Sequence, residues 1–150
     1  MTNPIKEASA ALREVILAAA GRAVAENLLP GESLPDFTIE IPADTSHGDF
    51  ATNIAMASAR AFKMAPRKIA ELLTSQVVLD GTPFDRYEIA GPGFINFFLK
   101  PQWFASVVRT VEQEGESYGR SDYGQGKKVL VEFVSANPTG PMHIGNARGG

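Results

Sequence analysis

The stretch from residue 129 to residue 150 constrains the fold most strongly. Val129 to Val134 is a nearly continuous apolar run, which is typical of a strand buried on both faces of a parallel sheet. Residues 135–141 contain two turn pairs, Asn-Pro and Gly-Pro, so we expect a loop there. Residues 143–150 are mostly small and resemble the first turns of a helix. A strand, a glycine-bearing loop and a helix start in this order can place an anion at the helix N-terminus.

Two details of this stretch point to a ligand. Glu132 interrupts the apolar run, and a buried carboxylate needs a partner because an unpaired buried charge is costly. Either a cationic ligand supplies that partner or the carboxylate reaches water at the strand end, and spacing alone leaves both open. Gly145 leaves room for a ligand beside the backbone, and His143 and Asn146 could each donate a hydrogen bond to a phosphate. A histidine at a helix start is equally compatible with a capping or surface role.

The segment Glu132-Phe-Val-Ser-Ala-Asn-Pro-Thr-Gly-Pro-Met-His-Ile-Gly-Asn146 resembles the class I aminoacyl-tRNA synthetase nucleotide signature, His-Ile-Gly-His. Its flanking Ser-Ala-Asn-Pro-Thr-Gly-Pro is similar to that of bacterial arginyl-tRNA synthetases in particular. The sequence departs from the signature at Asn146, where the general motif has a second histidine. Asparagine keeps a hydrogen-bond donor but cannot carry charge.

Composition and length bound the possibilities. The 150 residues leave room for one domain and part of a second, and we interpret the chain as an N-terminal fragment of a longer enzyme. The absence of cysteine excludes disulfides and cysteine zinc sites and fits a cytoplasmic protein. No signal-peptide pattern or bilayer-length apolar run is present, so we expect no membrane partner. With a net charge of −3, any RNA contact must come from a local patch.

The first part of the chain reads as helices and short strands. Apolar residues from Ile5 to Ala23 fall at helical spacing and predict an amphipathic helix. The alternation over residues 37–41 predicts a half-buried strand. Asp49 is a candidate N-cap for a second helix, with Phe50 on its buried face. Pro66 suits the first position of a third helix.

A hairpin is predicted next. Gly91-Pro-Gly93 is a tight turn, and Phe94 to Leu99 is the returning strand, with one face formed by alternate apolar residues. The other face offers Phe94, Asn96 and Phe98. An exposed aromatic residue beside an asparagine can stack on an unpaired RNA base and bond to its edge. The alternative is a second buried face with Asn96 bonded to backbone.

The most basic stretch lies at the junction of the second and third helices, and consists of Arg60, Lys63, Arg67 and Lys68. These residues form either a solvated face or a phosphate contact. A last helix begins at Pro101 and stops at Gly115, and residues 116–127 are rich in glycine, serine and charge, which indicates a linker.

The fold class predicted is α+β. Residues 1–115 form an antiparallel sheet packed by helices, and residues 128–150 begin a Rossmann-like catalytic domain with its first strand. A lone parallel strand without neighbours cannot bury both faces. We therefore expect the last segment to be poorly ordered or to be covered by something other than its native sheet.

The resemblance implies a function: ATP-dependent attachment of L-arginine to tRNA(Arg) through an arginyl-adenylate. The additional N-terminal domain of this family resembles residues 1–115, with His47-Gly-Asp-Phe-Ala-Thr-Asn53 and Gly91-Pro-Gly-Phe-Ile-Asn-Phe97 as matching blocks. The first block is expected to be structural, tying its loop to the following helix. The second resembles the segment that contacts the tRNA D-loop, which implies that Phe94 stacks and Asn96 reads.

The resemblance also implies a division of roles in the last segment. Glu132, Ser135 and Asn137 would bind arginine, and Pro141, His143, Gly145 and Asn146 would bind ATP. Magnesium is expected with ATP, but no ligand set for a metal is visible. The family's lysine-rich second signature is absent, so this fragment alone should bind tRNA without catalysing. The enzyme is expected to be a cytoplasmic monomer.

Three rival functions stay open. A class I synthetase for another amino acid would share the ATP segment but should lack the hairpin block. A nucleotidyltransferase also uses a His-x-Gly-His motif but usually has no preceding domain. A stand-alone RNA-binding module would need neither Glu132 nor His143.

Overall fold

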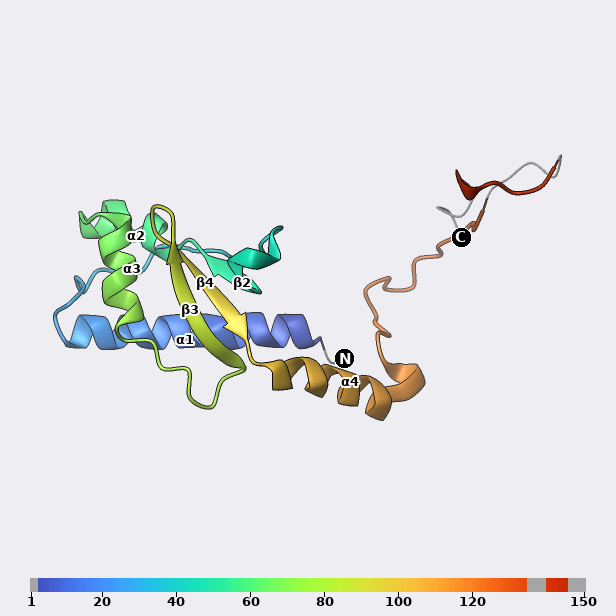
Figure 1. Ribbon diagram of the computed structural model, residues 1–150, viewed down its shortest axis with the longest axis horizontal. Coiled ribbons are helices and arrows are strands. Elements are labelled where there is room, and N and C mark those ends of the chain that lie inside the picture. Colours follow the sequence, from blue (N-terminus) through green and yellow to red (C-terminus); the bar gives the residue numbers. More distant parts are fainter. Residues whose placement is uncertain (1–2, 135–139, 146–150) are drawn as a thin grey trace. The chain divides into compact units, whose positions relative to one another are not determined.

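The structure, a computed structural model, describes residues 3–134 and 140–145 (Figure 1). It divides into two units, Met1–Gly119 and Arg120–Gly150, and the regular elements lie in the first. These elements are α1 (Pro4–Ala25), β1 (Ile39–Glu40), η1 (Thr45–His47), β2 (Phe50–Thr52), α2 (Ile54–Phe62), α3 (Pro66–Thr74), β3 (Phe84–Ala90), β4 (Phe94–Leu99), α4 (Pro101–Glu114) and η2 (Gly115–Ser117).

Helices α1, α3 and α4 begin where the sequence predicts. Asn3 caps α1 by accepting a hydrogen bond from the Lys6 backbone N–H at 3.0 Å, and Pro4 occupies its first turn. Proline likewise opens α3 and α4. The predicted apolar stripe of α1 is buried except for Ile5, which is 51% exposed because it lies in the first turn, at the edge of the core.

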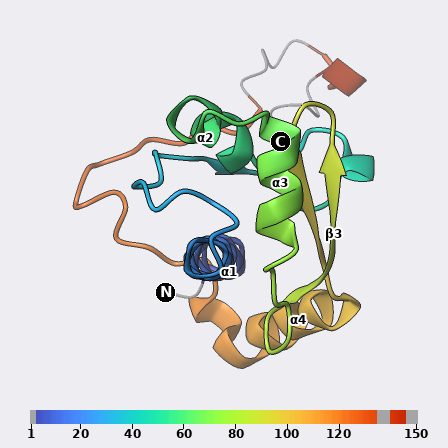
Figure 2. The same ribbon diagram turned by 90° about the vertical axis from the view of Figure 1, so that its left-hand side faces the viewer.

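The sheet is antiparallel throughout, with strand order β1-β2-β4-β3. The hairpin of β3 and β4 confirms the sequence prediction, and β2 joins β4 on its other side. Helices α1, α2 and α3 lie on one face of the sheet, and α4 lies at one end of the unit (Figure 2). The α+β prediction is therefore confirmed for this unit.

The core lies between the sheet and these helices. Ile95 and Phe97 of β4 are 0% exposed and Leu99 is 8% exposed, so one face of β4 is core as predicted. The Phe84 ring meets the rings of Phe50 and Phe97 edge-on, with centroids 5.9 Å apart in both pairs. Burial of each of these rings contributes about 1.5–3 kcal/mol to folding.

The predicted second helix starts later than expected. Asp49 is not a helix N-cap, because residues 50–52 form β2 and α2 begins at Ile54. Phe50 is buried, but on a strand rather than on the helix. The strand predicted over residues 37–41 is shorter, since only Ile39 and Glu40 pair with β2.

Residues 128–134 are not in a strand in the structure. Val129, Leu130 and Phe133 are 77%, 95% and 72% exposed. A strand requires a hydrogen-bonded neighbour, and among the described residues no segment pairs with this one. The first strand of a Rossmann-like domain is therefore not confirmed and stays a prediction.

Candidate nucleic-acid interface

The sheet face opposite the helices carries the predicted RNA-contact residues. Phe94, Asn96 and Phe98 alternate with the core residues of β4, so they share this outer face. Asn96 lies directly opposite Ala51 on β2 and Glu88 on β3. Because directly opposite residues project to the same side, the Asn96 amide lies at the centre of the outer face, between two strands.

Burial modifies the sequence expectation of an open aromatic pair. Asn96 is only 5% exposed, and Phe94 and Phe98 are half-buried. In the described part of the chain, the Asn96 side chain makes no hydrogen bond, so the alternative of a backbone-bonded amide is not what the structure contains. Its polar atoms nevertheless keep some contact with solvent. Among the described residues, the side-chain polar atoms that are both fully buried and without a partner comprise Ser58 Oγ and do not include those of Asn96.

Arg86 distinguishes the two aromatic residues of the outer face. Its guanidinium carbon lies 3.4 Å from the centroid of the Phe98 ring, and its side chain also forms an ion pair with Glu88. Phe98 is therefore covered by a cation, whereas no such contact involves Phe94 in the described residues. Sequence reasoning missed Arg86. The alternation of Arg86 and Glu88 with Tyr87 on β3 was the signal that could have found it.

The block from His47 to Asn53 fastens the sheet beneath this face. The Asp49 backbone N–H donates to the Phe97 carbonyl at 2.9 Å, and the Leu99 N–H donates to Asp49 Oδ2 at 2.8 Å. Gly48 has φ +87°, and a Cβ there would lie 2.8 Å from the Phe97 carbonyl oxygen. The block therefore bonds to β4, and its Thr52 Oγ1 also accepts a hydrogen bond from the Ile54 N–H at the start of α2.

The basic residues predicted at the helix junction are all exposed: Arg60, Lys63, Arg67 and Lys68. Arg67 donates a hydrogen bond to the Gly91 carbonyl at 3.2 Å. The Pro66 backbone carbonyl carbon lies 3.0 Å from the position that a Cβ on Gly93 would take. The helix junction is therefore in contact with the hairpin turn that precedes Phe94.

The predicted arginine and ATP residues lie in the second unit. Glu132, Pro141, His143 and Gly145 are exposed, and the His143 Nδ1 accepts a hydrogen bond from the Gly145 N–H at 3.1 Å. The remaining predicted residues, Ser135, Asn137 and Asn146, lie outside the described residues. The structure does not bring these side chains together into a described site, so their roles stay predictions.

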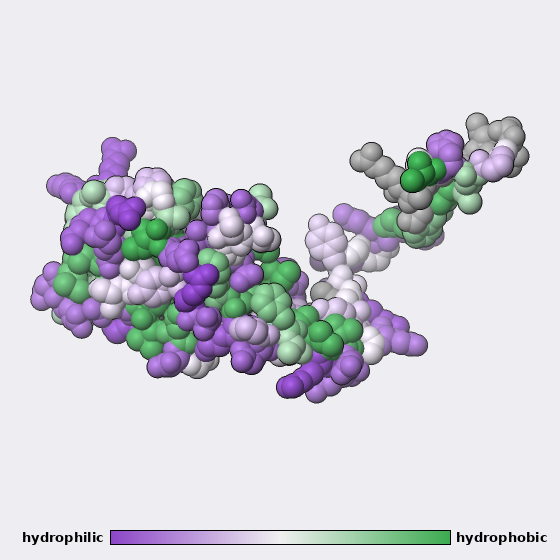
Figure 3. Space-filling view, in the orientation of Figure 1, coloured by the Kyte–Doolittle hydropathy of each residue, from purple (hydrophilic) through white to green (hydrophobic). Residues whose placement is uncertain are grey.

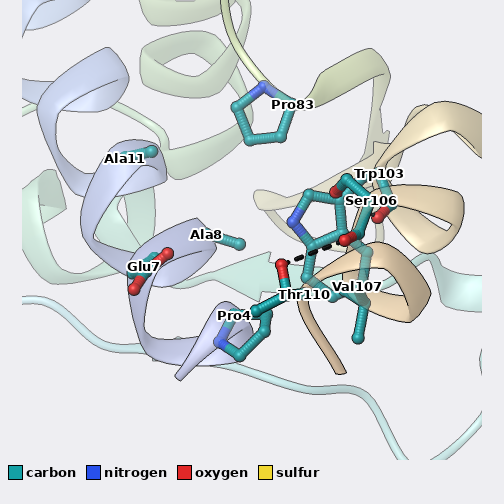
Figure 4. A pocket seen from close by; sticks show the side chains of 9 residues that line it. All are labelled: Pro4, Glu7, Ala8, Ala11, Pro83, Trp103, Ser106, Val107 and Thr110. Atoms are coloured by element: carbon teal, nitrogen blue, oxygen red, sulfur yellow. Dashed lines mark hydrogen bonds between the residues drawn. The ribbon is translucent and has the colours of Figure 1, made fainter. Parts of the chain in front are cut away.

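A cavity of about 300 Å³ lies between α1, Pro83 and α4 (Figure 4). Its lining combines apolar residues, among them Trp103 and Val107 of α4, with polar ones, which are Glu7, Ser106 and Thr110. The Thr110 hydroxyl is already engaged, because it donates to the Ser106 carbonyl at 3.0 Å. Some hydrophobic surface is visible in the region of α4 in Figure 3. Among the residues of α4, Phe104 is 49% exposed. Nothing in this lining forms a catalytic constellation.

Neither a metal-binding cluster nor a membrane-spanning helix is found among the described residues. Within residues 3–134 and 140–145, no group of three or more histidine, aspartate or glutamate side chains could hold a metal ion, so we assign no magnesium site. The helices that the structure describes include none that is both long and apolar enough to cross a membrane.

Comparisons with known proteins agree with the fold. Residues 6–99 match the family model described as arginyl tRNA synthetase N terminal domain. The chain is 51% identical over its whole length to an arginine–tRNA ligase of Caldanaerobacter subterraneus subsp. tengcongensis and 48% identical to one of Acetivibrio thermocellus. It spans 27% of the length of each of these relatives.

Solved structures also resemble the fold, and one example is given by an arginyl-tRNA synthetase. The crystal structure of the arginyl-tRNA synthetase from Plasmodium falciparum superposes with a TM-score of 0.55 at 16% sequence identity. The superposition covers 69% of this chain and 18% of that one. At this identity the likeness concerns the fold alone.

Proposed function

The chain belongs to the family of arginyl-tRNA synthetase N-terminal domains, and from that premise we propose that it is the amino-terminal part of an arginine–tRNA ligase. The full enzyme attaches L-arginine to tRNA(Arg) through an arginyl-adenylate formed with ATP. In this proposal residues 1–115 recognise tRNA, residues 116–127 are a linker and residues 128–150 begin the catalytic domain. The isolated chain binds tRNA and does not catalyse, and the enzyme works as a cytoplasmic monomer.

The observation that carries the enzymatic proposal is the family match over residues 6–99, continued by identity to arginine–tRNA ligases through residue 150. The outer face of β4 supports the tRNA-binding role of the first unit. Asn96 is 5% exposed and makes no hydrogen bond to another described residue, while its amide keeps contact with solvent. In this proposal a base edge replaces water at that amide, and Phe94 beside it offers a stacking surface.

The last segment supplies the substrate contacts in this proposal. Glu132 pairs with a cationic group of arginine, and Ser135 and Asn137 hold the amino acid. ATP is seated by four residues, which are Pro141, His143, Gly145 and Asn146. These residues position the arginine carboxylate for attack on the α-phosphate, and most of the catalytic gain comes from positioning and charge stabilisation.

Aminoacylation by the full-length enzyme tests the activity. Each amino acid is offered in turn with total tRNA, and charging with arginine alone is expected. Charging with another amino acid would keep the class I mechanism and overturn the substrate. Glu132→Gln is expected to raise KM for arginine far more than KM for ATP, and equal losses would overturn the role of Glu132.

Binding of the 150-residue chain to tRNA(Arg) tests the first unit separately. Asn96→Val is expected to weaken binding while leaving thermal stability unchanged or higher, because the amide makes no hydrogen bond in the described structure. Gln102→Ala, which removes an exposed amide from α4, serves as the control and should alter neither property. If Asn96→Val binds tRNA(Arg) as tightly as the unaltered chain, Asn96 is not part of the tRNA interface.

A further inference from the structure

The segment around the junction of α2 and α3 is positively charged, although the chain as a whole carries a net negative charge. Between Asp49 and Glu71 the sequence has four basic residues and no acidic one, although the net charge of the chain is −3. All four are exposed, and they define what we call the α2–α3 basic surface: Arg60, Lys63, Arg67 and Lys68. Such a run of one sign is compatible with a solvated face as well as with an anionic partner, so the contacts of these side chains have to decide between the two.

Most of this positive charge is uncompensated. Arg67 is the exception, because its Nε lies 3.7 Å from Glu71 Oε1 and its guanidinium also donates to the Gly91 carbonyl. In the part of the chain that the structure describes, Arg60, Lys63 and Lys68 have no ion pair and no side-chain hydrogen bond. Three cations are therefore available to an external anion.

The backbone at Lys63 adds an independent observation. Lys63 ends α2 in the left-handed conformation, with φ +50° and ψ +38°, and its N–H donates to the Ala59 carbonyl. Glycine is the usual residue at such a helix end because it adopts this conformation without steric cost. A lysine here costs folding free energy, and no contact of its side chain in the described residues offsets that cost. A backbone outlier of this kind points to function.

The basic surface is continuous with the proposed base-reading face. Gly91 accepts the hydrogen bond from Arg67, Gly93 packs against Pro66, and Phe94 follows directly as the first residue of β4. Figures 1 and 2 both show the turn between β3 and β4 beside the start of α3. The helix junction and the first residue of the proposed base-reading face therefore meet at this turn.

We propose that the α2–α3 basic surface binds the sugar–phosphate backbone of tRNA, through Arg60, Lys63 and Lys68, next to the nucleotide read on the outer face of β4. This inference rests on the proposed function and assigns phosphate-binding residues to it. Phosphate contacts fix the register of the RNA but do not read its sequence. The surface thus sets affinity and salt dependence, whereas Asn96 sets discrimination.

The salt dependence of binding tests this assignment. Affinity of the 150-residue chain for a labelled tRNA(Arg) transcript is measured by fluorescence anisotropy at a series of KCl concentrations. The variant carries Arg60→Gln, Lys63→Gln and Lys68→Gln. The control carries Lys6→Gln, Arg109→Gln and Arg120→Gln, which removes the same charge from exposed positions elsewhere.

Each lost phosphate contact lowers the slope of log K against log salt by roughly 0.7–0.9. The variant is expected to lose about 2–3 from the slope and to bind roughly tenfold more weakly or worse at 0.1 M salt. The control should keep the slope of the unaltered chain. Equal slopes and affinities for variant and control would overturn the assignment. It would also be overturned if the unaltered chain and the control both failed to bind tRNA.

A single substitution separates binding from folding. Lys63→Gly removes one cation at a position where glycine is the favoured residue, so its unfolding midpoint in urea should be equal or higher. Its tRNA affinity should fall all the same, by several-fold at low salt. Unchanged affinity with a raised midpoint would show that Lys63 acts on the fold alone.

The full-length enzyme distinguishes this inference from the proposed function. The triple variant should raise KM for tRNA(Arg) and leave KM for arginine unchanged. If the triple variant charges tRNA with arginine at an unchanged KM for tRNA(Arg), the phosphate assignment is overturned and the proposed ligase function is not. Failure of the unaltered enzyme to charge tRNA with arginine would instead overturn the proposed function.

Discussion

Gly48→Ala is the substitution whose effect follows most directly from the structure. Gly48 has φ +87°, and a Cβ built on it lies 2.8 Å from the Phe97 carbonyl oxygen and 3.4 Å from a ring carbon of Phe98. The nearest atom belongs to the backbone of β4, the strand that pairs with both β2 and β3, so it cannot move aside without disturbing the sheet.

The magnitude has three parts. Gly48 has φ +87° and ψ −172°, a backbone conformation that essentially only glycine adopts, and it costs an alanine about 1–3 kcal/mol. Alanine also restricts the unfolded chain more than glycine does, which raises the free energy of unfolding by about 0.4–1 kcal/mol. Overpacking against a fixed neighbour adds about 1–3 kcal/mol. Gly48→Ala should therefore lower the free energy of unfolding by about 2–4 kcal/mol.

Gly81→Ala provides the matched control. Gly81 has φ +75°, and nothing lies within 4 Å of its added Cβ, so this variant carries the conformational cost without the clash. It should lose only about 0.5–1 kcal/mol. Urea denaturation followed by far-UV circular dichroism measures both variants. Equal losses would refute the reasoning, because the close approach to β4 would then contribute nothing.

Three further predictions concern single side chains. Ser58→Ala should raise stability by about 1 kcal/mol in urea denaturation, because the buried hydroxyl has no partner among the described residues and alanine favours helix. Asp49→Ala should lower the free energy of unfolding by about 1.5 kcal/mol, since it removes the acceptor of the Leu99 N–H, and Asp49→Asn should lose less. The Ser46 hydroxyl and then the Ser46 backbone N–H hold the pKa of Asp44 below its ordinary value. Ser46→Ala should move that pKa upward in an NMR titration. The associated stability is present above the ordinary carboxyl pKa and is lost as pH falls through the lowered value.

Local signals were sufficient for most of the fold. The periodicity of α1, the proline at the start of α3 and the glycine turn between β3 and β4 each act through neighbouring residues, and each prediction is confirmed. The error at Asp49 has a non-local cause. β2 has only 3 residues, too few for an alternating pattern, and it exists because β4 pairs with it from more than forty positions away along the chain.

The candidate interface was predictable in its residues but not in its environment. Alternation placed Phe94 and Asn96 on one face, whereas the 5% exposure of Asn96 depends on strands that approach from both sides. The Arg86 contact with the Phe98 ring depends in turn on the register of β3 with β4, and that register cannot be derived from the sequence pattern. The arginine and ATP residues stay predictions, since the described part of their segment is exposed and not in a sheet.

The position of β4 between β2 and β3 has a consequence for how the chain reaches this fold. β3 and β4 are joined by a short turn and can pair within microseconds, whereas the bond between Asp49 and Leu99 joins residues separated by 50 positions. Closing that loop costs entropy before β2 gains its pairing. We therefore expect the hairpin of β3 and β4 to form first and β2 to pair with β4 afterwards. The contact of Gly48 and Asp49 with β4 then forms late in folding, so its loss should mainly increase the rate of unfolding.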